Sequence, residues 1–250
     1  MLKKTSIAAA VAAASALILI AGGCAATSTG KAETAKPAQD TAKPAPDTAK
    51  PKAVDYTAMT PTALAEYLIF ESGSYDLNQP TQEGTNGRAR LTQDEIQKAC
   101  TLKKSEELSD KAREKVMALA AASIRYPEGG IKLGDWKKGR QLAWSGFGFR
   151  TAHNPDKHGP GEAGGNCYNC HQLATDRTGG TIGPSLTDYG KIRGSSPEML
   201  KYTYDIIYNA NATFPCTNMP RNGANGILND AQIADIMAYL FDPESPVNKH

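Results

Sequence analysis

The stretch Cys167–His171, Cys-Tyr-Asn-Cys-His, constrains this chain more than any other feature of its sequence. Two thiols three positions apart can each form a thioether with one of the two vinyl groups of a haem, and the histidine that follows can then bind the iron. The sequence therefore predicts one covalently attached haem c, held by Cys167 and Cys170, with His171 as the proximal iron ligand.

Two other uses of a C-x-x-C pair fit this sequence less well. A thioredoxin-like redox pair normally lies at a strand-to-helix turn in a βαβ unit, and the flanks of this motif have no strand pattern. A zinc site needs four ligands, and the chain offers no second cysteine pair and no suitably spaced histidines. Export also favours haem, because c-type haem is attached outside the cytoplasm.

The N-terminal residues have the pattern of an export signal. Two lysines precede an apolar run over residues 7–20, which is shorter than the roughly 20 apolar residues that a membrane-spanning helix needs. Residues 21–24, Ala-Gly-Gly-Cys, resemble a bacterial lipoprotein cleavage site, with Ala21 in place of the usual leucine. We therefore predict a signal peptide over residues 1–23, a periplasmic protein, and Cys24 as the candidate for lipidation and membrane tethering.

Residues 24–55 predict a disordered Pro/Ala/Lys linker. The motif Thr-Ala-Lys-Pro begins at residues 34, 41 and 48, and the repeat contains no large apolar side chain, so it cannot bury a core. Repeated prolines favour an extended, semi-stiff backbone. We interpret the segment as a spacer between the N-terminus and the rest of the protein; a linker with no specific role is the alternative.

Residues 56–130 predict a helical extension. A helix begins at Thr60, the pair Thr92 and Glu95 has the spacing of a capping box, and residues 105–125 are rich in helix-forming residues. The extension contains no catalytic constellation, so its carboxylates and lysines are interpreted as a solvated helical surface.

The second axial ligand of the iron is predicted to be Met219, which stands in the loop Thr-Asn-Met-Pro, 48 positions after His171. A soft sulfur donor suits low-spin haem iron. Met237 belongs to an apolar stripe at helical spacing and is interpreted as core. His153 and His158 would give a bis-histidine centre, but they lie in a polar loop rich in Gly and Pro, and we favour Met219.

Two further features support the haem site. Pro184 follows His171 by 13 positions, and a proline carbonyl there can accept the imidazole N–H; an ordinary turn is the alternative. A final helix is predicted to begin at Asn229, with Gln232 completing the cap. We expect Tyr239 of that helix to pack near Gly139 of an earlier helix.

Two cysteines remain once the haem and lipid positions are assigned. They are Cys100 and Cys216, and an even remainder in an oxidising compartment favours a disulfide. Such a bond would join the helical extension to the loop that carries Met219. Two separate buried thiols are the alternative.

The charge of the chain argues against a nucleic-acid partner. Lys plus Arg is 28 and Asp plus Glu is 26, which gives a formal net charge of only +2. With 40% hydrophobic residues, the composition also excludes a membrane protein with several spans.

The motifs together resemble a class I cytochrome c domain. More closely, the stretches GGNCYNCHQ, IGPSLTDYG and NATFPCTNMPRNGANGILNDAQIADIMAYL resemble the SoxX family, the mono-haem subunits of the SoxAX cytochromes of thiosulfate oxidation. The resemblance implies an all-α protein, with a class I cytochrome c-like domain over residues 131–250 preceded by the helical extension and the linker.

The resemblance also implies a function. In SoxAX the partner SoxA carries the site where thiosulfate is joined to a cysteine of the SoxYZ carrier, which is L-cysteine S-thiosulfotransferase activity, and the electrons pass through this haem to a soluble cytochrome c. We expect no catalytic residue in this chain, no activity of the isolated chain, and an apolar docking surface near Cys167, Tyr168 and the Met219 loop. The alternative is a stand-alone periplasmic lipoprotein cytochrome c that shuttles electrons to an oxidase.

Overall fold

The computed structural model describes residues 54–81, 83–101, 108–148 and 162–250, and in these ranges every regular element is a helix. The only β pairing among them is an isolated bridge between Pro80 and Asn86. The prediction of an all-α protein is confirmed. The predicted signal peptide, Cys24, nearly all of the linker, and the alternative ligands His153 and His158 lie outside the described residues. None of the described helices is both long and apolar enough to span a membrane.

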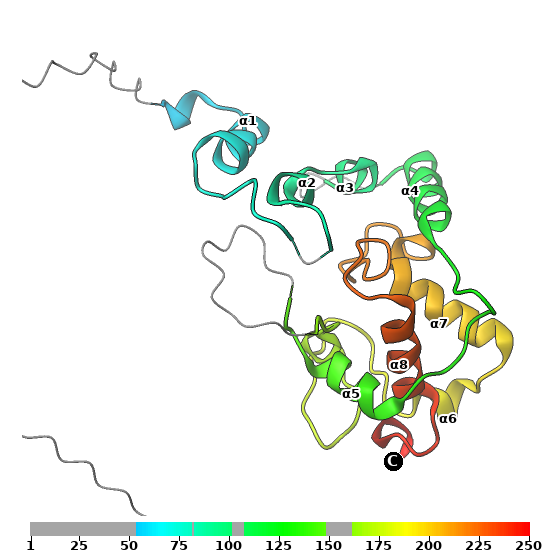
Figure 1. The fold of residues 1–250 in the computed structure, drawn as a ribbon. Helices are drawn as coiled ribbons and strands as arrows, with labels where there is room; N and C mark the ends of the chain where they lie inside the picture. The colour runs from blue at the N-terminus through cyan, green and yellow to red at the C-terminus, as the bar shows by residue number, and fades with distance from the viewer. Residues whose placement is uncertain (1–53, 82, 102–107, 149–161) are drawn as a thin grey trace, which may run out of the picture. The chain divides into compact units, whose positions relative to one another are not determined.

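The helical extension contains several short elements and one longer helix (Figure 1). Thr60 caps the first α-helix as predicted, because its hydroxyl accepts a hydrogen bond of 3.2 Å from the backbone N–H of Ala63, and Pro61 occupies the first helical position. The elements are η1 (Tyr56–Ala58), α1 (Pro61–Glu66), the π-helical turn η2 (Tyr67–Glu71), α2 (Gly87–Leu91), α3 (Glu95–Cys100) and α4 (Asp110–Ser123).

The predicted capping box between Thr92 and Glu95 is wrong. The Thr92 hydroxyl donates to the carbonyl of Arg88 at 2.7 Å and closes α2. Asp94 caps α3 instead: its carboxylate accepts from the Gln97 N–H at 2.8 Å, and the Gln97 side chain accepts from the Asp94 N–H at 2.9 Å. Thr92 and Asp94 could each cap the start of α3. Because the Thr92 hydroxyl bonds to the carbonyl of Arg88, Asp94 is the residue that caps it.

The second half of the chain forms the elements around the haem motif. The predicted capping box of the last helix is confirmed, with both hydrogen bonds between Asn229 and Gln232 at 2.9 Å. The elements are α5 (Trp136–Trp144), η3 (Cys167–Asn169), α6 (Tyr189–Arg193), α7 (Pro197–Asn209), η4 (Ala210–Ala212), α8 (Asp230–Phe241) and η5 (Pro246–Asn248).

Helices α5 and α8 pack against each other through Gly139. A Cβ atom at this position would lie 2.5 Å from the carbonyl carbon of Asp235 and 3.0 Å from the nitrogen of Ile236, so only glycine permits this approach. We expected Tyr239 to pack near Gly139. Gly139 contacts the α8 backbone at Asp235, one helical turn before Tyr239. The Tyr239 hydroxyl instead lies 2.7 Å from the hydroxyl of Tyr168.

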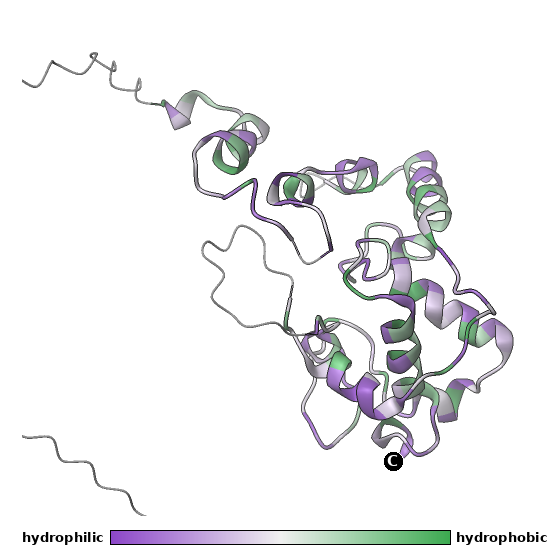
Figure 2. Cartoon of the chain, in the orientation of Figure 1, coloured by the Kyte–Doolittle hydropathy of each residue, from purple (hydrophilic) through white to green (hydrophobic). Residues whose placement is uncertain are grey.

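Residues Val54–His250 form one compact unit. Two separate clusters of buried side chains stabilise it. The main core is centred on α5, α7 and α8, and hydrophobic positions recur along α8 in Figure 2. Met237 is fully buried there, as predicted. The smaller core consists of Ile96, Val116 and Ala120, with Ala99, Cys100, Ala212 and Cys216 packed against it.

Candidate haem site

The two thiols of the haem motif lie on a single turn. Asn166 has a left-handed backbone with φ of 48°, and η3 follows at once. The N–H groups of Cys170 and His171 both donate to the carbonyl of Cys167, at 3.1 and 2.9 Å. Both cysteines are half-buried and free of disulfides.

The environment of Cys167 argues against a dithiol redox pair. Burial raises the pKa of the Cys167 thiol to about 12. A redox-active cysteine needs the opposite, a lowered pKa that favours the thiolate. Within the described residues, no group of three or more His, Cys, Asp or Glu side chains is arranged to hold a metal ion. Of the three uses of Cys167 and Cys170 considered, these observations favour covalent attachment of a group through the two sulfur atoms.

The His171 ring is fixed by a backbone carbonyl. Its Nδ1 lies 2.7 Å from the oxygen of Pro184. Because a carbonyl oxygen can only accept, Nδ1 carries the proton, and Nε2 keeps a free lone pair that can bind iron. The predicted role of Pro184 has the geometry it requires.

The loop before Pro184 approaches the His171 ring so closely that only glycine fits. A Cβ atom on Gly183 would lie 2.6 Å from Nδ1 and 2.8 Å from Nε2 of the ring. The Gly183 N–H also donates to the carbonyl of Cys170 at 2.7 Å, and the Gly180 N–H donates to that of Tyr168 at 2.8 Å. The proximal loop is therefore bonded directly to the turn that carries the thiols.

Met219 lies in the loop that connects η4 to α8. Its side chain is half-buried and packs against the main core, as does that of Cys167. The loop is shaped by local hydrogen bonds: the Met219 N–H donates to the hydroxyl of Thr217 at 3.3 Å, and the Cys216 N–H donates to the Asn211 side chain at 2.8 Å. Met199 and Met237, by contrast, lie on α7 and α8.

A pair of tyrosines connects the motif to α8. The hydroxyl of Tyr168 lies 2.7 Å from that of Tyr239 and accepts a hydrogen bond of 3.2 Å from the N–H of Ala174. Burial raises the pKa of Tyr239, and the bond from Tyr168 adds to that effect. Tyr168 is only 5% exposed, so its side chain is not part of the docking surface expected near it. It faces the core instead.

The remaining two described cysteines are bonded to each other. Cys100, the last residue of α3, and Cys216 form a disulfide with an S–S distance of 2.07 Å. The bond joins the helical extension to the loop of Met219. Nothing in the sequence pattern identified a second connection between the same segments, an ion pair of 2.7 Å between Asp94 and Arg221.

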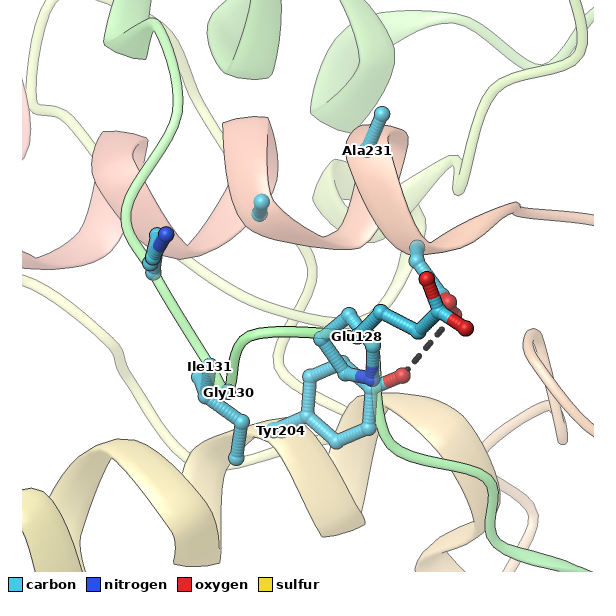
Figure 3. Close-up of a pocket in the computed structure, with 9 residues that line it drawn as sticks. Glu128, Gly130, Ile131, Tyr204 and Ala231 are labelled. Carbon is cyan, nitrogen blue, oxygen red and sulfur yellow. Dashed lines mark hydrogen bonds between the residues drawn. The ribbon is translucent and has the colours of Figure 1, made fainter.

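A surface pocket with a volume of about 250 Å³ lies apart from these residues (Figure 3). The Tyr204 hydroxyl in its lining lies 2.9 Å from the carboxylate of Asp230 and 2.8 Å from the carbonyl of Arg125, so Tyr204 and Asp230 already pair with each other. The lining contains neither a thiol nor His171 nor Met219: it consists of Pro127, Glu128, Gly130, Ile131, Lys132, Tyr204, Asp230, Ala231 and Ala234.

The residues of this site fit a covalently attached haem. Two thiols share one turn, an imidazole is held with one nitrogen free, and glycine stands where any side chain would meet that imidazole. Residues 161–242, which contain all of these groups, match the family model for cytochrome c. The chain therefore belongs to the c-type cytochromes, and it carries covalently bound haem c with iron.

The chain is also similar to an uncharacterized lipoprotein of Aquifex aeolicus (strain VF5). The two are 42% identical over 166 residues, which cover 65% of this chain and 76% of the relative. Haem c supplies an iron that takes up and releases one electron at a time, so electron transfer is the chemistry of this protein.

Proposed function

We propose that this chain is the haem subunit of a SoxAX cytochrome, which accepts the electrons released when thiosulfate is joined to a carrier cysteine. The observation that carries this proposal is the hydrogen bond from His171 Nδ1 to the Pro184 carbonyl, which leaves Nε2 able to bind iron, and it is supported by Met219, which is half-buried against the same core as Cys167. With both residues as ligands the iron would bind no substrate, so the chain would relay electrons and would not transform thiosulfate itself.

The chemistry of the complex determines what this chain has to do. Thiosulfate and a carrier thiol form a cysteine S-thiosulfonate, and one S–S bond forms as one S–H bond breaks. The reaction releases one proton and two electrons. A single haem held by Cys167, Cys170 and His171 would supply a carrier for one electron at a time, so the two electrons would leave this chain in turn, each to a soluble cytochrome c. SoxA would hold the reacting sulfur atoms, and SoxYZ would supply the carrier cysteine.

Two exposed side chains near the site give the partner a place to bind. Ile182 is 74% exposed and directly precedes Gly183, and Phe214 is 51% exposed and lies in the loop of Met219. Apolar side chains at the centre of an interface are the ones that most often contribute to binding. We propose that SoxA binds over these two residues, Ile182 in the loop before Pro184 and Phe214 in the loop that carries Met219.

The second candidate function is a stand-alone lipoprotein cytochrome that delivers electrons to an oxidase. The name of the Aquifex relative favours it, together with the cleavage-site pattern before Cys24. Both functions place the protein outside the cytoplasm, with the lipid on Cys24 attaching it to a membrane. They differ in whether a partner is needed for reduction of the haem.

Thiosulfate-dependent reduction of the purified protein separates the two functions. We expect the absorbance of the ferrous haem to appear only when SoxA and SoxYZ are both present. An Ile182→Lys variant should be reduced more slowly in that mixture, whereas Ile192→Lys, equally exposed at 75% but located on α6, should behave as wild type. No reduction in the full mixture, or equal reduction by thiosulfate alone, would exclude the SoxAX role.

A further inference from the structure

Both ends of α3 are connected to the loop that carries Met219. At the end of the helix, Cys100 forms the disulfide with Cys216, three residues before Met219. At its start, the carboxylate of Asp94 lies 2.7 Å from the guanidinium of Arg221, two residues after Met219. The candidate ligand therefore stands between two anchors on one helix of the extension.

Helix α3 is held in place independently of these two anchors. Ile96 is 8% exposed and packs with Val116 and Ala120 of α4, both of which are fully buried. Helix α4 in turn packs against η4, where the loop begins. The pair between Glu95 of α3 and Lys115 of α4, at 3.4 Å, is exposed to solvent and adds little to this packing. A fixed helix can restrain a loop, whereas a helix that depended on the loop could not.

The loop keeps its shape through turn hydrogen bonds and a few packing contacts, without the ladder of bonds that a long helix has. After η4 it contains turns and no regular element before α8. Cys216 has a left-handed backbone with φ of 61°, which is uncommon for a residue other than glycine. The Arg221 side chain is only 12% exposed, so its charge is largely removed from water and depends on Asp94 for a partner.

We propose that α3 is a positioning element for the distal iron ligand: Asp94 and Cys100 hold the loop so that the sulfur of Met219 stays at the iron. The inference rests on Met219 being that ligand, as the proposed function has it. Release of either anchor lets the loop sample open conformations, in which an external ligand can replace the sulfur.

The sharpest variant is Asp94→Asn. Asparagine caps a helix as well as aspartate does, so α3 keeps its start while the charge opposite Arg221 is lost. The matched control is Glu95→Gln, which removes the neighbouring carboxylate, whose ion pairs are with Lys98 and Lys115. We expect imidazole to bind the ferric haem about threefold to fivefold faster in Asp94→Asn, and at the wild-type rate in Glu95→Gln.

The disulfide is tested with the double variant Cys100→Ser, Cys216→Ser. Mass spectrometry of an unreduced digest of the wild type first establishes that the two peptides are linked. We expect imidazole binding to accelerate more than tenfold in the double variant and the weak sulfur-to-iron band at the red edge of the ferric spectrum to lose intensity. If the double variant does not fold, Asp94→Asn decides alone, because it retains the disulfide.

Val247→Ala separates positioning from general loss of stability. Val247 is fully buried in the main core at η5, so the variant removes packing there but leaves both anchors and the packing of α3 on α4 intact, and the unfolding temperature should fall with little change in imidazole binding. Equal acceleration in Val247→Ala and Asp94→Asn at equal loss of stability would overturn the inference. So would wild-type binding in both anchor variants.

A wrong assignment of Met219 as the iron ligand would give a different set of results from a wrong role of α3. If Met219 is not the ligand, the sulfur-to-iron band is absent from the wild type, and Met219→Ala binds imidazole as the wild type does. If the band is present but the anchor variants bind imidazole at the wild-type rate, Met219 remains the ligand and α3 has no positioning role.

Discussion

A single methyl group at Gly183 should disturb the proximal ligand. A Cβ atom there would lie 2.6 Å from Nδ1 and 2.8 Å from Nε2 of His171, well short of the 3.4 Å at which ordinary contact begins. The backbone of Gly183 is not in the left-handed region, so alanine introduces no backbone strain. The whole cost of Gly183→Ala is therefore the clash with the imidazole.

The magnitudes decide which interaction gives way. Overpacking of this kind costs about 1–3 kcal/mol, whereas the hydrogen bond from Nδ1–H to the Pro184 carbonyl contributes about 1 kcal/mol. The loop cannot easily retreat, because the Gly183 N–H is bonded to the carbonyl of Cys170 at 2.7 Å. We expect the ring to tilt and the bond to Pro184 to break.

Two measurements follow from that outcome. An imidazole without its hydrogen bond is a less basic ligand and stabilises ferric iron less, so the reduction potential of Gly183→Ala should rise in a spectroelectrochemical titration. The unfolding temperature should fall by roughly 2–12 °C, at about 2–4 °C per kcal/mol for a unit of this size. The control is Ile182→Ala, in the adjacent and 74% exposed residue, which should change neither quantity. An unchanged potential and unfolding temperature in Gly183→Ala would refute the reasoning.

Three further variants test separate parts of the structure. Gly139→Ala should lower the unfolding temperature, because overpacking against the backbone of Asp235 outweighs a gain of about 1 kcal/mol in helix propensity; a rise would contradict the helix crossing. Met219→Ala should lose the sulfur-to-iron band and lower the potential, since the ligand that favours ferrous iron is gone, and an unaltered spectrum would show that another group binds the iron. Burial alone would raise the pKa of Glu83, but the hydrogen bond from Arg90, at 2.6 Å, together with further hydrogen bonds and the Arg90 charge outweighs it, so the pKa of Glu83 is lowered on folding. Stability from this pair is present above about pH 4 and is lost as pH falls through the folded pKa, so Glu83→Gln should be less stable at neutral pH and show a flatter acid limb in unfolding titrations.

Features that depend on neighbouring residues could be predicted from the sequence. The spacing of Cys167, Cys170 and His171 is imposed by the chemistry of haem attachment, and it needs no knowledge of the fold. The helix starts at Thr60 and Asn229 follow from hydrogen bonds within three residues. Such local patterns identify the cofactor and the proximal ligand.

Features that depend on distant residues could not be predicted in the same way. The ion pair of Asp94 with Arg221 joins positions 127 residues apart, and no local pattern marks either one. The predicted capping box at Thr92 was wrong because the Thr92 hydroxyl closes the preceding helix, which no local pattern indicated. A docking surface was expected near Tyr168, but the side chain itself is buried because its hydroxyl bonds to a partner on α8.

The two sides of the haem site differ in how they are held, and this difference explains where the extension acts. The proximal side is built from residues close in sequence: Gly183 and Pro184 bond directly to Cys170 and His171. A short closed segment loses little entropy when it orders. Met219 lies 48 positions after His171, on a loop without regular structure, so its placement costs more and depends on connections to distant parts of the chain. We propose that α3, which is bonded to that loop before and after Met219, supplies those connections on the side where they are needed.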